Sequence, residues 1–196
     1  MFGGPYITNA AQFLIATLFG LYILAVMLRF LLQLVHADFF NPVSQFLVKI
    51  TNPPLRPLQR VIPGWRGLDM AALLLLILLQ ATELALLAGL DPRPVAMPAV
   101  PGLLVLSLAE LLRLLLNIFF FTILIQVVLS WINPGQYNPA VHLLEQLNEP
   151  VMRPARRMLP PMGGLDLSPI VVLIALQLAR ILLVQPLTDL GYQLAR

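Results

Sequence analysis

The stretch NPVSQFLVKITNPPLRPLQRVIPGWRGLDMAALLLLILLQ at residues 41–80 has a counterpart, NPAVHLLEQLNEPVMRPARRMLPPMGGLDLSPIVVLIALQ, at residues 138–177. Adding 97 to each residue number aligns the two stretches without a gap, and 15 of the 40 positions are identical. Many of the identical residues are prolines, glycines and charged residues, which a shared apolar composition alone would not produce. The sequence therefore predicts two copies of one unit, at residues 1–97 and 98–196.

Each copy carries two stretches that are long and apolar enough to cross a membrane. Charged residues make up only 11% of the chain and hydrophobic residues 59%, whereas a soluble domain has about 25% charged residues. A helix of about 20 apolar residues spans the bilayer core and satisfies its own backbone there. Four such stretches occur, at about residues 10–35, 70–90, 103–132 and 167–187. We therefore expect an all-α membrane protein with four transmembrane helices.

The basic residues indicate how these helices are oriented. The two long loops, at residues 36–68 and 133–165, hold seven lysines and arginines, whereas the opposite side holds only Arg93 and Arg196. Basic residues are retained on the cytoplasmic side, so we predict cytoplasmic loops and both termini outside. Each unit crosses the membrane twice, which makes the repeats parallel and related by an axis along the membrane normal.

Both loops repeat one local pattern. Asn41-Pro42 and Asn138-Pro139 are typical of a helix cap followed by proline in the first turn, and apolar residues at helical spacing follow them. We expect a short amphipathic helix in each loop, lying on the bilayer surface or over the bundle. The prolines at residues 53–63 and 150–160 are expected to prevent a continuous helix there. Asp69 and Asp166 are expected to cap the next spanning helix.

These residues resemble the YggT family of bacterial and plastid membrane proteins, which includes the YlmG proteins. The second loop matches the family motif through Asn148, Glu149, Pro150, Arg153, Pro154, Arg157, Pro160, Gly164, Asp166, Ser168 and Pro169. The first loop matches it through Thr51, Pro53, Arg56, Pro57, Arg60, Pro63, Gly67 and Asp69, but has Ala71-Ala72 where Ser-Pro is usual. The resemblance covers nearly the whole chain and favours the two-repeat proteobacterial form.

The resemblance implies a bacterial inner-membrane protein of poorly defined biochemistry, and the distribution of basic residues then predicts that both termini are periplasmic. Family members have been linked to cell or plastid division, nucleoid organisation, maturation of membrane complexes, and osmotic or ion homeostasis. No catalytic residues are carried over from the family.

The arginines and prolines of the loops are the first candidate site. Two interpretations stay open, a basic cytoplasmic surface that docks a protein partner or anionic lipid, and a set of residues that only fixes topology. The candidate residues are Arg56, Pro57, Arg60, Arg153, Pro154 and Arg157.

Polar residues inside the spanning stretches are the second candidate site. Glu83 and Arg180 are equivalent in the repeat, so the two opposite charges are expected at the same depth. A charge in the membrane centre is costly, and such groups usually pair or line a polar cavity. The predicted cluster consists of Glu83, Arg180, Glu110, Arg113, Gln80 and Gln177. A structural clasp between the four helices and a polar path for an ion or solute are the two alternatives.

Nothing in the sequence indicates an enzyme. The chain has no cysteine, and no Walker motif, HExxH or nucleophile elbow occurs. We expect no direct nucleic-acid binding, because the basic residues lie in loops between apolar runs. We also expect no cofactor and no metal, because the two histidines, His36 and His142, lie in loops and do not match in the repeat. The favoured function is a scaffold or assembly factor with a membrane or division-machinery partner. The alternative is a channel or transporter component in ion or osmotic balance, which would require a homo-oligomer.

Overall fold

The computed structural model describes residues 4–65, 67–91, 98–132, 138–158 and 166–195. Apart from a bridge between Trp65 and Leu68, the regular structure in this part of the chain is helical. The elements in order are α1 (Gly4–Leu34), α2 (Pro42–Val61), α3 (Met70–Gly89), α4 (Val100–Ile132), α5 (Pro139–Met158), α6 (Ser168–Ala179), the π-helical turn η1 (Arg180–Val184) and α7 (Gln185–Leu194).

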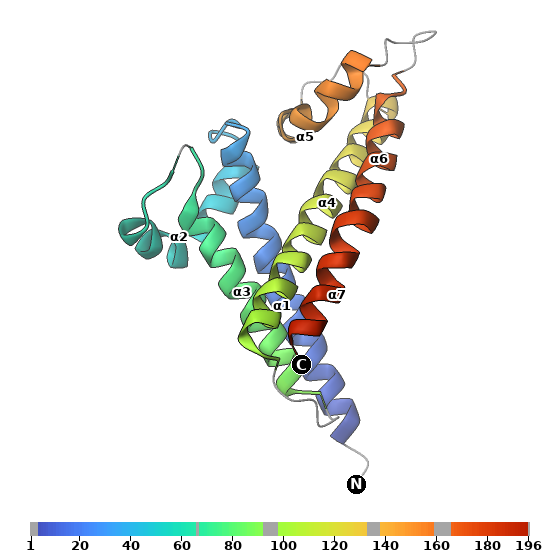
Figure 1. Ribbon diagram of the computed structural model, residues 1–196. Coiled ribbons are helices and arrows are strands. Elements are labelled where there is room, and N and C mark those ends of the chain that lie inside the picture. Colours follow the sequence, from blue (N-terminus) through green and yellow to red (C-terminus); the bar gives the residue numbers. More distant parts are fainter. Residues whose placement is uncertain (1–3, 66, 92–97, 133–137, 159–165, 196) are drawn as a thin grey trace.

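Four helices are long and apolar enough to cross a membrane, which confirms the predicted fold class. They cover Tyr6–Leu34, Met70–Gly89, Val100–Ile132 and Ser168–Leu194. In Figure 1, α1 and α4 run toward the end of the molecule that holds α5, while α3 and the α6–α7 helix run back. Both termini therefore lie at the other end, and the two units point the same way.

The fourth spanning helix continues beyond the predicted end near residue 187. It reaches Leu194 and widens into the π-helical turn η1 just before Pro186. A proline lacks the N–H that the preceding turn needs, and π-helical turns are a common way for a helix to absorb such an interruption. The helix can thus pass Pro186 without ending.

The core lies where α1, α3 and α4 meet. Val26 of α1 and Leu76 of α3 are fully buried, and Leu55 of α2 and Leu147 of α5 join the same cluster. The helix α4 packs against α3 on one side and against α6 and α7 on the other. Near the termini, α4 and α7 approach so closely that a Cβ atom on Gly102 would overlap the backbone of Ala195. Small residues permit such approaches between membrane helices.

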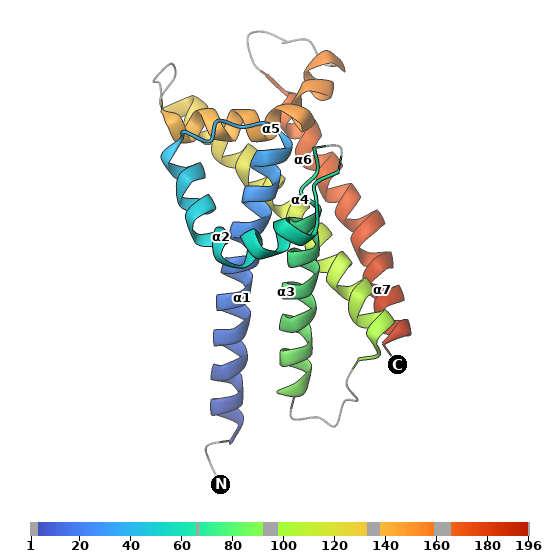
Figure 2. The same cartoon turned by 90° about the vertical axis from the view of Figure 1, so that its left-hand side faces the viewer.

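The prediction that the loop prolines prevent a continuous helix is wrong. The helix α2 runs through Pro53, Pro54 and Pro57, α5 runs through Pro150 and Pro154, and Figure 2 shows both helices bent. Each proline removes the N–H that would bond to the carbonyl four residues earlier. For Pro54 that carbonyl belongs to Ile50, and the Tyr22 hydroxyl of α1 donates to it at 3.4 Å. A spanning helix thus supplies a donor that the loop helix lacks.

The predicted caps are confirmed at Asn41, Asn138 and Asp69, whereas Leu167 and not Asp166 holds the cap position of α6. The side chains of Asn41 and Asn138 each accept from the backbone N–H two residues later, at 2.9 Å in both cases. The carboxylate of Asp69 accepts from the N–H of Ala72 at 3.0 Å, and that of Asp166 accepts from Ser168 at 2.9 Å. The register read from the sequence therefore holds in the local geometry.

Candidate functional site

The loop arginines lie on the surfaces of α2 and α5. Arg56 and Arg60 of α2, and Arg153 and Arg157 of α5, are exposed. A spacing of four residues places each pair on one face of its helix. None of the four guanidinium groups has a hydrogen-bond or ion-pair partner among the residues that the structure describes. Unpaired guanidinium groups can bind anionic groups such as carboxylates and phosphates.

The two arginine pairs do not form one surface. The N-terminal ends of α2 and α5 approach each other, but Figures 1 and 2 show that their C-terminal halves diverge. The prolines Pro57 and Pro154 lie in these diverging halves and are exposed. Each repeat thus presents its own basic surface.

Arg29 of α1 fixes α2 to the first spanning helix. Its side chain is 9% exposed, and its Nη1 atom donates to Thr51 Oγ1 and to Asn52 Oδ1, both at 2.8 Å. It also lies 3.5 Å from the carbonyl oxygen of Val48. Sequence reasoning missed this role because Arg29 only interrupted an apolar run; the signal was a lone charge in a spanning helix, together with polar side chains at the bend of the next helix.

The second repeat forms the equivalent joint without a charge. Gln126 stands at the position of Arg29, and Asn148 stands at that of Thr51. The Asn148 side chain is fully buried; its Nδ2 donates to Gln126 Oε1 at 2.8 Å, and its Oδ1 accepts from Thr122 Oγ1 at 2.7 Å. Both loop helices are therefore tied to a spanning helix through buried polar groups.

A second equivalent contact joins each loop helix to the aspartate that precedes the next spanning helix. Gln59 Nε2 donates to Asp69 Oδ2 at 2.6 Å, and Arg156 Nε donates to Asp166 Oδ2 at 3.3 Å. Partial burial alone would raise the pKa of the Asp166 carboxyl, but the hydrogen bonds from Ser168 and the charge of Arg156 outweigh it and hold that pKa below its usual range. Arg156 also contacts Glu149 at 3.5 Å. Among the loop arginines that the structure describes, Arg156 is the one paired with carboxylates of the chain.

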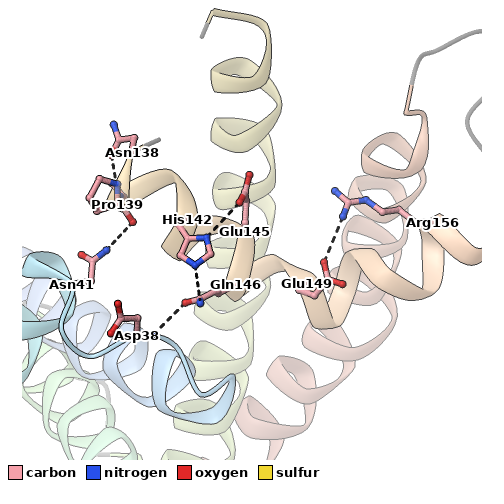
Figure 3. A network of polar contacts seen from close by, with 10 residues as sticks. Asp38, Asn41, Asn138, Pro139, His142, Glu145, Gln146, Glu149 and Arg156 are labelled. Carbon is pink, nitrogen blue, oxygen red and sulfur yellow. Dashed lines mark hydrogen bonds and ion pairs between the residues drawn. The ribbon is translucent and has the colours of Figure 1, made fainter. Parts of the chain in front are cut away.

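The two repeats meet where α5 begins. Asn41 Nδ2 donates to the carbonyl of Pro139 at 2.7 Å, and the backbone N–H of Asp38 donates to Gln146 Oε1 at 3.2 Å (Figure 3). Beneath these bonds, Leu143 of α5 packs into an apolar cluster of α1 and α2 residues. The start of α5 therefore lies on the first repeat.

The six polar residues of the spanning helices do not form one cluster. Gln80 Nε2 donates to Glu83 Oε2 at 2.9 Å on α3. Glu110 and Arg113 form an ion pair at 3.1 Å within α4. The expected ion pair between Glu83 and Arg180 is not formed, because α4 lies between α3 and the α6–α7 helix.

Arg180 and Gln177 line a cavity of about 210 Å³ together with Asn117, Leu116, Phe120, Phe121 and Leu176 of the two neighbouring helices. The structure therefore does not bring the six predicted residues into one four-helix clasp. Among the described residues, no group of three or more histidine, aspartate or glutamate side chains is arranged to hold a metal.

Comparison with known proteins agrees with this architecture. The sequence pattern of the CCB3/YggT family matches the chain twice, over residues 8–90 and 105–187, an offset of 97 residues at both ends. The chain is 46% identical over 181 residues to "Uncharacterized protein PA0392" of Pseudomonas aeruginosa, covering 92% of this chain and 91% of that protein. It is 36% identical over 168 residues to "Uncharacterized protein YggT" of Escherichia coli K12, covering 86% of each.

A more distant relative aligns over a shorter stretch. "Uncharacterized protein ycf19" of Guillardia theta is 35% identical over 63 residues, which covers 69% of that protein and 32% of this chain. No solved structure matches. The family pattern found twice at the repeat offset, and relatives aligned along most of their length, show that this chain belongs to the CCB3/YggT family.

Proposed function

We propose that this protein is a non-enzymatic scaffold or assembly factor of the bacterial inner membrane. In this proposal Arg56 and Arg60 of α2, and Arg153 and Arg157 of α5, dock an acidic surface of a membrane-protein partner. The observation that carries it is that all four guanidinium groups are exposed and have no partner among the described residues. Arginine recognises carboxylates and phosphates through paired hydrogen bonds, so anionic lipid is the alternative ligand.

The anchoring of the two loop helices supports this proposal. Arg29 holds α2, and Gln126 with Asn148 holds α5, through buried hydrogen bonds. A helix that only fixed topology would not need such contacts, since positive charge alone retains a loop in the cytoplasm. We place the loops in the cytoplasm and both termini in the periplasm. We propose that the scaffold acts in cell division or in the maturation of membrane complexes, the processes that the family resemblance implies.

The test replaces Arg56 and Arg153 together by alanine. We expect the double variant to insert and accumulate normally but to fail to complement a deletion strain. Copurification in mild detergent should lose a stoichiometric membrane partner. Lys49→Ala is the matched control, because it removes an exposed positive charge of α2 outside the arginine pair. Normal complementation by the double variant would contradict docking, and loss of binding to anionic vesicles with the protein partner still bound would assign the arginines to lipid.

A channel or transporter component is the second candidate function. Arg180 lies within a spanning helix at a π-helical turn, lines a cavity with Asn117 and Gln177, and has no ion-pair partner among the described residues. Charged groups and π-helical turns in membrane helices often mark functional sites. If this function is correct, the Arg180→Gln variant should accumulate normally but fail to restore osmotic or ion balance in a deletion strain. If Arg180 has only a structural role, the same substitution should lower the protein level.

A further inference from the structure

Equivalent positions of the two repeats hold a guanidinium group in one case and a cavity in the other. In the first repeat, Arg29 reaches from the spanning helix to the bend of α2, where it contacts the carbonyl of Val48 and the side chains of Thr51 and Asn52. With 9% of the residue exposed, its guanidinium fills the space between α1 and α2.

In the second repeat, Gln126 replaces Arg29, and its shorter side chain is occupied by the hydrogen bond from Asn148. A cavity of about 160 Å³ remains there. It is lined by Gln126, Glu145, Asn148, Glu149, Met152 and Arg156. Of these, Asn148 is fully buried, so the floor of the cavity is polar and fixed.

Two residues that line the cavity are acidic, whereas the equivalent residues of the first repeat are neutral. Val48 and Asn52, which contact Arg29, correspond to Glu145 and Glu149 of the second repeat. The loss of an internal cation thus coincides with the gain of two carboxylates. Arg156 contacts Glu149, as Figure 3 shows, and it also contacts Asp166. The other carboxylate, that of Glu145, lies 3.8 Å from the imidazole of His142. A net negative charge therefore remains around the cavity.

We propose that the cavity between α4 and α5 binds a guanidinium or ammonium group that the chain does not itself supply. This group would take the place that the Arg29 guanidinium has in the first repeat, with Glu145 and Glu149 as its acceptors. Charge-assisted hydrogen bonds to two carboxylates favour an organic cation over a neutral ligand. The site is separate from the exposed arginines of the proposed function, so either proposal can fail without the other.

The direct test titrates the purified full chain in nanodiscs with guanidinium chloride in the low millimolar range, and separately with argininamide. Sodium chloride at matched ionic strength is the reference. We expect saturable binding by calorimetry that sodium does not reproduce. The absence of saturable binding beyond the sodium reference would overturn the proposal.

Two variants connect this binding to the cavity. Gln126→Arg should place the chain's own guanidinium in the space, as in the first repeat, and should abolish binding. Glu149→Gln should weaken binding about tenfold, the loss expected for one charge-assisted hydrogen bond. Gln193→Arg is the control, because it adds the same charge on the exposed surface of α7 and should leave binding unchanged. Unchanged binding in both cavity variants would overturn the proposal, and since Glu149 is half-exposed, Glu149→Gln keeps the test valid if Gln126→Arg does not fold.

A crosslinking experiment identifies the source of the cation. A photoreactive residue at the exposed position His142, one helical turn from Glu145, should capture a protein in cells if a partner's arginine or lysine occupies the cavity, and the capture should be lost in the Gln126→Arg background. Saturable argininamide binding without any captured protein would support a free small cation. Capture that persists in the Gln126→Arg background, with no cation binding, would contradict the site.

Discussion

The first and second repeats attach their loop helices to the membrane bundle with different chemistry. In the first, the charged Arg29 reaches three acceptors on α2. In the second, neutral Gln126 and Thr122 bond to Asn148. A charge at a buried joint gives stronger individual hydrogen bonds but costs more to desolvate. The common architecture therefore depends on satisfying polar groups at the bend, whereas the type of group differs between repeats.

The two repeats also differ in how they satisfy a backbone carbonyl at the bend of the loop helix. Pro54 removes the donor of the Ile50 carbonyl, and Tyr22 replaces it. In the second repeat, residue 151 is valine and the equivalent of Tyr22 is Phe119. Val151 keeps its backbone N–H, so no hydroxyl is needed. The presence of proline and the presence of tyrosine go together.

Removal of Arg29 should have the largest effect. Arg29→Ala leaves the side chains of Thr51 and Asn52 without their buried donor, and we expect a loss of about 3 kcal/mol in the free energy of unfolding. Denaturant unfolding in detergent measures this loss, and limited proteolysis should show cleavage of α2 first. Lys49→Ala on the exposed face serves as control. A change below that of the control would mean that Arg29 does not hold α2.

Asn148→Ala should have a smaller effect on the second repeat. It removes a buried side chain and leaves the Gln126 carbonyl oxygen and the Thr122 hydroxyl short of one partner, at a cost of about 2 kcal/mol. The same unfolding measurement applies, and proteolysis should now begin in α5. If α2 were released first, the two joints would not be independent.

Tyr22→Phe should cost about 0.5–1 kcal/mol, since one long neutral hydrogen bond is lost. The loss should vanish when Pro54→Val is introduced with it, because the helix then supplies its own donor. A double-mutant cycle on thermal stability measures this coupling. If Tyr22→Phe lowered the thermal stability equally with and without Pro54, the Tyr22 hydroxyl would not be replacing the donor that Pro54 removes.

The smallest effect concerns pH. The folded pKa of the Asp166 carboxyl is lowered, so its contribution to stability is present above the ordinary pKa of aspartate and is lost as pH falls through the folded value. The side chain is 45% exposed, so solvent screening limits this contribution to less than about 1 kcal/mol. Asp166→Asn should flatten the acid side of the stability profile. An unchanged acid limb in this variant would show that Asp166 does not contribute.

Sequence reasoning predicted the elements that depend on local or periodic signals. The apolar runs define the four spans, and the repeat register places the caps at Asn41, Asp69 and Asn138. The continuity of α2 was missed because the hydrogen-bond donor to the Ile50 carbonyl comes from Tyr22, 28 residues away in the sequence. The repeat register also predicted that Glu83 and Arg180 lie at the same depth in the membrane. Equal depth does not bring two side chains together, because it does not determine which helices are neighbours. The position of α4 between α3 and the α6–α7 helix follows from tertiary packing.

The joint between the repeats also has a consequence for gene duplication. Each of its two bonds links a side chain of one half to the backbone of the other, Asn41 to Pro139 and Gln146 to Asp38. Asn138 is the counterpart of Asn41, yet among the described residues it makes no matching bond to Pro42. Both bonds are donated by the first half, so two identical units would have to take different roles. Fusion into one chain fixes the two roles, and because one partner in each bond is a main-chain atom, that residue can change in sequence without losing the bond.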